Sequence, residues 1–391
     1  MPDHAEPSSG KIPTEALPRS EEGRLDWLQL FRSPRVGPTT FIRLIRAHGS
    51  ASAALEALPE IAARSGSRYY ALASRSSVET EWEAAMEASA FPLLLGAEDY
   101  PALLATISDA PPLLWAIGNP QLLNQPQVGL VGARNASALG CRMAARLASE
   151  LGQIGYGIVS GLARGVDAAA HRAALETGTI AVQAGGVDTI YPPSNAELAR
   201  QIPESGLRLS EMPMGHEPRA KDFPRRNRII SGIAQGIVVI EGALRSGSLI
   251  TARNALDQGR EVMAVPGSPL DPRAGGCNQL IRDGAVLVRS GEDVAETLAQ
   301  GAPASPRYTP SAEPEKTVPR SIESPQSPPK AAPSTPPEPA GILTLLGPVP
   351  IPEHALAREL GQSAARLAAE LTDLELSGLI RRHPGGLISL A

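Results

Sequence analysis

The chain has 391 residues, 42% of them hydrophobic and 20% charged, with a formal net charge of -5 at pH 7. This length exceeds one typical domain, so we expect about two or three. The acidic net charge disfavours a protein that covers nucleic acid non-specifically through a basic surface. An aromatic content of 3% argues against a protein that covers single-stranded DNA by stacking many bases on aromatic side chains.

Sorting signals and paired cysteines are not evident in the sequence. No apolar run approaches the length of a membrane span, and MPDHAEPSSG at the start does not resemble a signal peptide. Cys141 and Cys277 lie far apart and match no disulfide framework or zinc spacing. We therefore expect a cytoplasmic protein with reduced thiols, no metal site and no membrane association.

The N-terminal part is predicted to be a tail followed by a small helical domain. Residues 1–22 are rich in proline, serine and charge, which favours disorder. In 23–90, LDWLQLF and FIRLIRAHG place apolar residues three and four apart, on either side of the turn SPRVGPTT. This pattern is typical of a SAM-like or helix-hairpin-helix domain, whose turn amides can hold a phosphate. An ordinary turn in a small helical domain is the alternative.

The central segment, 91–300, is predicted to be an α/β domain. After a proline-punctuated lead-in to residue 126, apolar runs of strand length alternate with helical segments, as in VGLVGA before RMAARLASELGQIG. Continuous apolar strands that alternate with helices predict an extended Rossmann-like domain, with a parallel sheet covered on both faces.

The C-terminal part is predicted to be a linker and a winged helix. Residues 301–339 are dominated by proline, serine, glutamate and lysine, which predicts an extended linker. In 340–391 three helical segments precede a short hairpin with the turn HPGG. Arg381 and Arg382 near this turn are outnumbered by acidic residues, so we favour a protein-contact or regulatory role over duplex DNA binding.

The loops that follow the predicted strands suggest an anion-binding crevice. In an open α/β sheet, ligands bind outside the carboxyl ends of the strands. The loops at 132–137, 160–167 and 241–248 combine glycine with serine or arginine ahead of a helix, where backbone N–H groups favour anions. The candidate residues in these loops are Gly132, Arg134, Ser137, Ser160, Gly161, Arg164, Ser246, Gly247 and Ser248.

A dense cationic stretch, DFPRRNRIISG at 222–232, adds candidate residues to this anion-binding crevice. Arginine presents a planar fork that suits phosphate oxygens, so a group of arginines at adjacent loops favours phosphate binding over isolated surface charges. The sequence does not decide which of two arginines faces the crevice, or whether the phenylalanine stacks on a base or anchors the loop. The candidates here are Lys221, Phe223, Arg225, Arg226, Asn227 and Arg228.

No catalytic residue or cofactor is predicted. The sequence contains no G-x-x-x-x-G-K-[ST] motif, no G-x-G-x-x-G after the first strand and no G-x-S-x-G, which disfavours P-loop ATP hydrolysis, NAD binding and a serine nucleophile. His171 is expected to be structural. Glu211 and Glu241 end strands and are expected to cap loops or pair with arginines.

The blocks VGLVGARNAS, FPRRNRIISG and VVIEGALRSGSLITARNALDQGREVMAVPG resemble the DprA/Smf DNA-processing family. The resemblance covers roughly 91–298, and the flanking modules fit the family's arrangement. It implies a homodimer, formed through the Rossmann-like domain, that binds single-stranded DNA and helps to load the RecA recombinase during natural transformation. It implies a pocket built from Arg134, Phe223, Arg225 or Arg226, and Arg228, beside Lys221.

Two alternatives stay open. Arg228 can instead support Glu241. The same fold class also includes phosphoribohydrolases of the lysine-decarboxylase-like fold, which split nucleoside monophosphates and resemble P-G-G-x-G-T-x-x-E. The corresponding region here, E-G-A-L-R-S-G-S, lacks that pattern.

A pocket that neutralises about four phosphates should have a single-strand salt slope of roughly -0.7 per phosphate, or about -3 in total. A fourfold rise in salt should therefore weaken binding roughly 50-fold, and replacing Arg134 and Arg228 by alanine should lower affinity without unfolding the domain. A nearly flat salt titration of oligonucleotide affinity would contradict the cationic pocket.

Overall fold

The computed structural model describes residues 12–64, 70–301, 351–360, 364–377, 379–383 and 387–390. The chain forms two compact units, Met1–Thr309 and Pro310–Ala391. The predicted linker at 301–339 lies outside the described residues except for Gly301, which ends a helix, and the first part of the predicted tail lies outside them too. The rest of that tail differs from the prediction, because Ile12 and Ala16 are buried in the core and the first helix already begins at Glu21.

The N-terminal part is a bundle of helices, as predicted. Ser20 caps α1 by accepting a hydrogen bond from the N–H of Gly23, and α2 ends at Gly49 with φ at 78°, a left-handed conformation that favours glycine. Trp27 and Phe41 pack edge-to-face in its core, with ring centroids 4.8 Å apart. Its helices are α1 (Glu21–Arg32), α2 (Pro38–His48), α3 (Ala51–Arg64) and α4 (Arg75–Glu87).

A nine-stranded sheet follows, in the order β1-β2-β6-β5-β4-β3-β7-β8-β9. The strands from β6 to β9 in this order are parallel, as predicted, whereas β1 and β2 extend the sheet with antiparallel pairings. The strands are β1 (Phe91–Leu94), β2 (Leu113–Gly118), β3 (Gln127–Val131), β4 (Gly157–Ser160), β5 (Thr179–Val182), β6 (Leu207–Ser210), β7 (Gly236–Val239), β8 (Glu261–Ala264) and β9 (Val286–Leu287).

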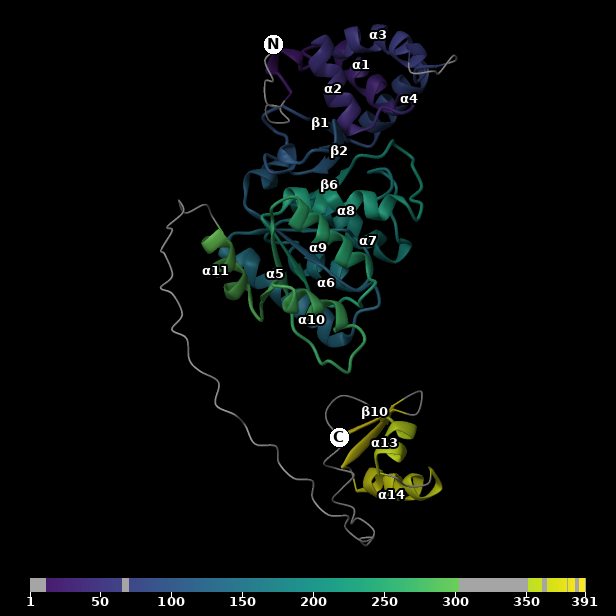
Figure 1. Ribbon diagram of the computed structural model, residues 1–391, viewed down its shortest axis with the longest axis vertical. Coiled ribbons are helices and arrows are strands. Elements are labelled where there is room, and N and C mark those ends of the chain that lie inside the picture. The colour runs from purple at the N-terminus through teal and green to yellow at the C-terminus, as the bar shows by residue number, and fades with distance from the viewer. Residues whose placement is uncertain are drawn as a thin grey trace, which may run out of the picture. The chain divides into compact units, whose positions relative to one another are not determined.

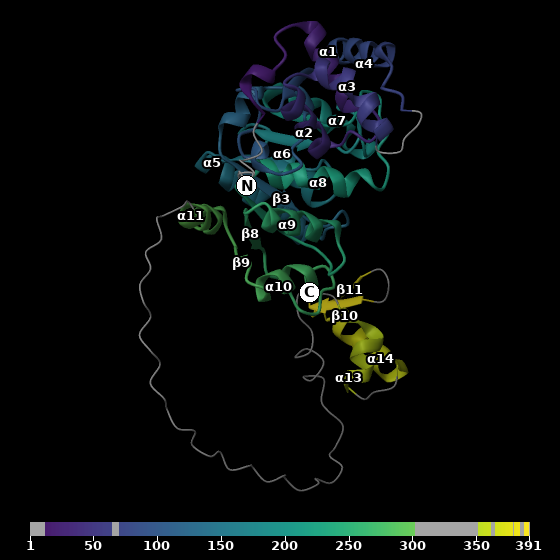
Figure 2. The same ribbon diagram turned by 45° about the horizontal axis from the view of Figure 1, so that its top comes forward.

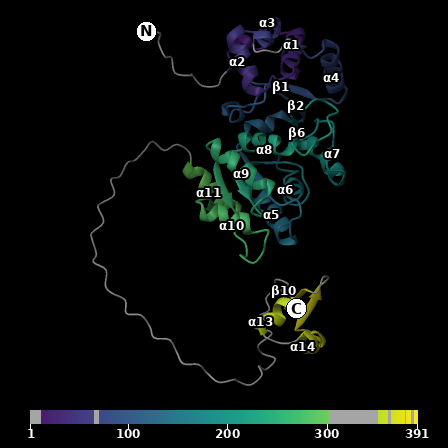
Figure 3. The same ribbon diagram turned by 45° about the vertical axis from the view of Figure 1, so that its right-hand side comes forward.

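Helices cover both faces of this sheet. In β3, β4, β5, β7 and β8, buried apolar residues next to one another in the strand belong to different core clusters, because successive side chains point to opposite faces. Val238 packs in a cluster with residues of α5, α6 and α11, and its neighbour Val239 packs with residues of α8 and α9. Figures 1 and 2 show α8 beside α9, and Figure 3 shows α5 beside α6. The helices are α5 (Ala138–Ile154), α6 (Val166–Ala173), α7 (Ala196–Ser205), α8 (Asp222–Ile233), α9 (Gly247–Asp257), α10 (Gly275–Arg282) and α11 (Gly291–Gly301).

The cationic stretch at 222–232 forms the helix α8, which the sequence analysis did not predict. Pro224 lies in its first turn, where the missing N–H has no intrahelical acceptor to lose. The buried residues of α8 include Arg226, Asn227 and Arg228 beside the isoleucines. The buried surface of this helix is therefore partly charged, which hides the usual apolar periodicity.

The bundle and the sheet are joined by hydrogen bonds that involve buried tryptophans. The indole N–H of Trp27 donates to the carbonyl of Pro112 at 2.9 Å, and that of Trp115 donates to Glu81 at 2.8 Å. Arg32 binds the same Glu81 carboxylate at 2.7 Å and also donates to the carbonyl of Glu211 at 3.1 Å. These contacts fix the bundle next to β1, β2 and the end of β6 (Figure 1).

The C-terminal unit has the helix and hairpin order of a winged helix. Its strands form a sheet in the order β10-β12-β11 over a core that includes Leu356, Leu367 and Ile388. The first predicted helix and most of the HPGG turn lie outside the described residues. The elements are β10 (Ile351–Pro352), α13 (Glu353–Leu360), α14 (Ala364–Leu376), β11 (Ile380–His383) and β12 (Leu387–Leu390). Across the described part of the chain, no helix has both the length and the apolar character needed to cross a bilayer.

Replacing Glu81 by alanine should lower the free energy of unfolding of the Met1–Thr309 unit by about 3 kcal/mol, because it leaves the largely buried Arg32, whose side chain is 14% exposed, without its carboxylate. Denaturant titration measures this change. Glu79 on the same helix is half exposed and pairs with Arg75 at 3.5 Å, so Glu79→Ala should cost no more than about 0.5 kcal/mol. Equal losses for the two variants would contradict the role given to Glu81.

Candidate nucleic-acid interface

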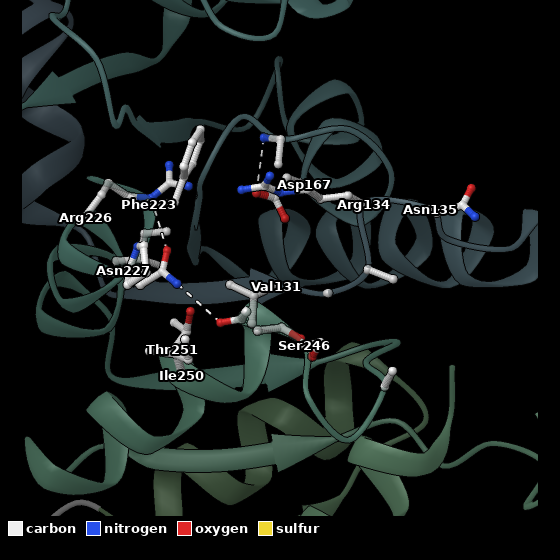
Figure 4. A pocket seen from close by; sticks show the side chains of 18 of the residues that line it. Val131, Arg134, Asn135, Asp167, Phe223, Arg226, Asn227, Ser246, Ile250 and Thr251 are labelled. Carbon is white, nitrogen blue, oxygen red and sulfur yellow. Dashed lines mark hydrogen bonds between the residues drawn. The ribbon is translucent and has the colours of Figure 1, made fainter. Parts of the chain in front are cut away.

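A crevice of about 840 Å³ lies at the carboxyl ends of β3 and β7, between the loops that follow them and α8. Figure 4 shows side chains from these segments facing it. A smaller pocket of about 310 Å³ shares Arg134, Tyr191 and Phe223 with the crevice. The predicted residues that line the crevice are Gly132, Arg134, Phe223, Arg226, Asn227, Ser246, Gly247 and Ser248. Gly161 and Arg164 line the smaller pocket.

Arg134 is an exposed cation of the crevice. It follows β3, and its guanidinium carbon lies 4.5 Å from the centroid of the Phe223 ring, which is the geometry of a cation–π contact. Within the described ranges, no carboxylate comes within ion-pair distance of Arg134. The aromatic ring therefore positions this guanidinium without neutralising it, and its donors stay available to an anion.

Arg226 forms the floor of the crevice. Its side chain is buried and donates to the carbonyl of Gly161 at 2.6 Å and to the carbonyl of Val182. Burial lowers the pKa of Arg226 to about 10, although the nearby carboxylate of Asp167 opposes this shift. Arg226 thus ties α8 to the ends of β4 and β5, and of the two adjacent arginines it is the one that faces the crevice.

Asp167 balances this buried cation. Burial raises the pKa of the Asp167 carboxyl, and Arg226 opposes the rise. The carboxylate accepts hydrogen bonds from the N–H groups of Gly161 at 3.1 Å and Ala163 at 3.2 Å. The loop after β4 is therefore held from two sides, by the Asp167 carboxylate that accepts from its N–H groups and by Arg226 of α8, which donates to the carbonyl of Gly161.

Arg225 and Arg228 lie on another side of α8 from Arg226, which corrects the prediction that Arg228 shares the pocket of Arg134. Both bind the buried carboxylate of Glu211, at 2.9 Å for Arg225 and 2.7 Å for Arg228, and Arg228 also pairs with Asp109 at 3.0 Å. The reason is helical geometry, because residues one and two positions away from Arg226 point in other directions.

Glu241 is engaged elsewhere, so the alternative that Arg228 supports it is wrong. The carboxylate of Glu241 accepts hydrogen bonds from the N–H of Ser137 at 2.8 Å and from its hydroxyl at 2.5 Å. The hydroxyl oxygen of Ser137 in turn caps α5 by accepting from the N–H of Gly140 at 2.9 Å. Ser137 does not line the crevice, which corrects its assignment as a phosphate contact.

Ser160 and Lys221 are also placed away from the crevice. The hydroxyl of Ser160 is fully buried and donates to the carbonyl of Leu130 at 2.6 Å, so it links β4 to β3. Lys221 is exposed at the start of α8 and lines neither the crevice nor the smaller pocket. Neither residue is retained as a contact.

The start of α9 contributes backbone groups. Ser246 is its N-cap residue but makes no side-chain capping bond, and its hydroxyl lies 2.6 Å from that of Ser248. The amide of Asn227 donates to the carbonyl of Gly247 at 3.3 Å, which joins α8 to this turn. The first N–H groups of an 11-residue helix therefore border the crevice, where they favour an anion.

The sequence analysis did not single out Tyr191 and Arg273. Tyr191 is 46% exposed, lines both the crevice and the smaller pocket, and packs against Phe223 with ring centroids 5.7 Å apart. Arg273 lines the crevice and pairs with Asp271 at 3.0 Å. Both lie in loops that follow parallel strands. The rule that ligands bind at the carboxyl ends of such strands could therefore have identified them from the sequence.

His171 is structural, as predicted. It is fully buried, its Nε2 accepts a hydrogen bond from the N–H of Leu162 at 3.3 Å, and its Nδ1 lies 2.7 Å from the hydroxyl oxygen of Thr179. Burial lowers the pKa of His171 to about 3, which keeps the imidazole neutral. Among the residues that the structure describes, no cluster of His, Cys, Asp or Glu is arranged to hold a metal ion.

Family comparisons match all parts of this architecture. Residues 92–299 match the model of DNA recombination-mediator protein A. The chain belongs to the DNA recombination-mediator protein A (DprA) family. Residues 21–84 match the DprA-like N-terminal HHH domain, and residues 326–386 match the DprA winged helix domain. The resemblance and the fold class derived from the sequence are confirmed.

Individual relatives agree with this assignment. Protein Smf of Escherichia coli is 41% identical over 296 residues, which are 75% of each chain. DNA processing protein DprA of Bacillus subtilis is 44% identical over 209 residues, covering 53% of this chain and 70% of that protein. The crystal structure of DprA from Streptococcus pneumoniae covers 63% of this chain and 81% of its own, with 38% identity and a TM-score of 0.54.

Replacing Arg228 by alanine should destabilise the Met1–Thr309 unit by about 3 kcal/mol, because Glu211 is 2% exposed and loses a buried partner. Arg225 binds the same carboxylate from a side chain that is 45% exposed, so Arg225→Ala should cost no more than about 1 kcal/mol. Denaturant unfolding compares the two variants. A fully stable Arg228→Ala protein that loses only DNA affinity would instead restore the interpretation drawn from the sequence.

Proposed function

We propose that this chain is a recombination mediator that binds single-stranded DNA in the crevice between β3, β7 and α8. The observation that carries the proposal is the exposed Arg134, which an aromatic ring positions and which has no carboxylate partner in the described part of the chain. Membership of the DprA family supports the proposal.

The proposed mechanism is capture of backbone phosphates by groups that are already in place. Arg134 offers its planar fork to phosphate oxygens, and the first N–H groups of α9 add donors that need no reorganisation. Arg226 contributes positive potential from the floor, while its own Nη1 donors are directed to carbonyl groups. The proposed contacts are Gly132, Arg134, Gly161, Arg164, Tyr191, Phe223, Arg226, Asn227, Ser246, Gly247, Ser248 and Arg273.

We propose different roles for the two aromatic rings. Arg134 lies over the Phe223 ring, so Phe223 positions the guanidinium, whereas the half-exposed Tyr191 offers a surface for a base. Stacking on an aromatic side chain requires a base that is not held in a duplex. This requirement accounts for selectivity towards single strands, although the phosphates of a duplex carry the same charge.

We propose that the strand is bound without cleavage. The carboxylate of Glu241 is engaged by Ser137, and the ring nitrogens of His171 contact Leu162 and Thr179. These groups therefore serve the fold rather than acid–base chemistry. The phosphoribohydrolase alternative is not favoured, and incubation with AMP should release no adenine.

The proposal includes a homodimer, formed through the Rossmann-like domain, that helps to load the RecA recombinase during natural transformation. The edge strand β9 supports an interface on this domain, because Val286 and Leu287 are 41% and 43% exposed and an apolar sheet edge is a ready site for association. The proposed location is the cytoplasm, in keeping with a DNA-processing family and with two free cysteines.

Replacing Arg134 by alanine should weaken binding of a single-stranded oligonucleotide about 10- to 100-fold, because a charge-assisted contact to phosphate is lost. A gel-shift titration measures this, with the matching duplex as a competitor that should bind more weakly. Arg142 is exposed on α5 and lines neither the crevice nor the smaller pocket, so Arg142→Ala should bind like the wild type. Equal affinity of the wild type for single and double strands would overturn the proposed function.

A further inference from the structure

The loop after β4 begins with three residues that have no regular secondary structure, Gly161, Leu162 and Ala163. Their backbone polar groups are nevertheless all bonded, because side chains take the place of a helix or sheet partner. The three N–H groups donate to Asp167 and His171. The side chains that donate to the three carbonyls are those of Arg226 and Asn195.

These bonds hold Leu162 in an unfavourable backbone conformation. Its φ is 56°, in the left-handed region that residues other than glycine rarely adopt. The Leu162 side chain is fully buried in a cluster with Leu198 and Ile202 of α7. Such a conformation persists only where surrounding contacts enforce it, which is common at ligand sites. Two residues later, the exposed Arg164 lines the smaller pocket.

Asn195 joins the two walls of the smaller pocket. One wall is the loop after β4, and the other is the segment 191–194, which leads directly into Asn195. The Asn195 side chain is buried, and its Nδ2 donates to the carbonyls of Leu162 at 2.9 Å and Ala163 at 3.1 Å. Because both partners are acceptors, only the amide nitrogen can make these bonds.

The side chain of Asn195 is not used where its position in the chain would place it. Asn195 is the N-cap residue of α7, and asparagine at this position usually accepts a hydrogen bond from the first turn of its own helix. No such side-chain capping bond is present. The amide instead fixes the distance between the two walls of the smaller pocket.

We propose that Asn195 is a positioning residue for DNA binding, which sets the spacing between Tyr191 and Arg164. This inference rests on the proposed function, in which Tyr191 offers a surface for a base and Arg164 contacts a phosphate. The two side chains line the smaller pocket from different walls, and among the described residues no carboxylate lies within ion-pair distance of Arg164. Asn195 itself lines neither pocket. It acts through the loop backbone, so that a base and a neighbouring phosphate are bound without rearrangement.

The test is the variant Asn195→Ala, whose affinity for a strand of about 16 nucleotides is measured by fluorescence anisotropy over a salt series. The affinity should fall roughly tenfold, because the base and the phosphate are no longer held together. The salt slope should become shallower by about 0.7, because the phosphate contact of Arg164 is lost. A residue that only stabilised the fold would leave this slope unchanged at temperatures where thermal unfolding shows the variant to be folded.

The matched control is Gln127, which is buried at the amino end of β3. Its Nε2 also donates to two carbonyls, those of Leu122 and Gln125, and it lines neither pocket. Gln127→Ala removes the same number of amide donor bonds and should keep the affinity and salt slope of the wild type. Wild-type binding by folded Asn195→Ala, or an equal loss in Gln127→Ala, would rule out the positioning role.

A second measurement does not depend on the folding of Asn195→Ala. Tyr191 and Arg164 are both exposed, so alanine at either position should leave the fold intact. If their spacing is fixed along one strand, the loss of affinity in the double variant Tyr191→Ala/Arg164→Ala should be smaller than the product of the two single losses. Losses that simply multiply would contradict the fixed spacing. Failure of the proposed function looks different, since the wild type would then not bind the single strand.

Discussion

A buried arginine that is bonded to strand ends determines the geometry of this protein's functional edge. Arg226 donates to the carbonyls of Gly161 and Val182, and Asp167 compensates its charge while holding the loop after β4. Burying a guanidinium is costly unless its donors are satisfied. The buried guanidinium is therefore stable only when α8, the loop after β4 and the sheet are placed so that these hydrogen bonds form. The same placement fixes the shape of the crevice.

The helix α8 carries arginines on two sides that differ in their balance of charge. On the crevice side, Arg134 has an aromatic partner and no carboxylate in the described residues. On the side that faces Glu211 and Asp109, Arg225 and Arg228 are largely neutralised by these carboxylates. The crevice therefore offers a free cation to a ligand, whereas Arg225 and Arg228 mainly hold α8 to the end of β6 and to Asp109.

This distribution explains how an acidic chain can serve a nucleic acid. A net charge of -5 opposes non-specific association over the surface, so attraction is confined to places where cations converge and carboxylates are absent or already paired. Few aromatic rings are needed, because a pocket uses one or two stacking surfaces rather than a continuous platform. Tyr191, in the loop after β5, is the ring proposed to stack on a base, and Phe223 at the start of α8 packs against it.

The sequence by itself determined the α/β class, the flanking helical modules, the family and the position of Arg134 after the first strand of the parallel sheet. These features depend on local periodicity and on the rule that strand ends share one edge. The tertiary structure decided that 222–232 is a helix, that Arg226 rather than Arg225 faces the crevice, that Ser137 and Ser160 are used inside the fold, and that Tyr191 joins Phe223. The physical reason is that a side chain's direction and partner depend on contacts between segments far apart in the chain. A charged residue that is buried by such contacts looks the same in sequence as one exposed to water.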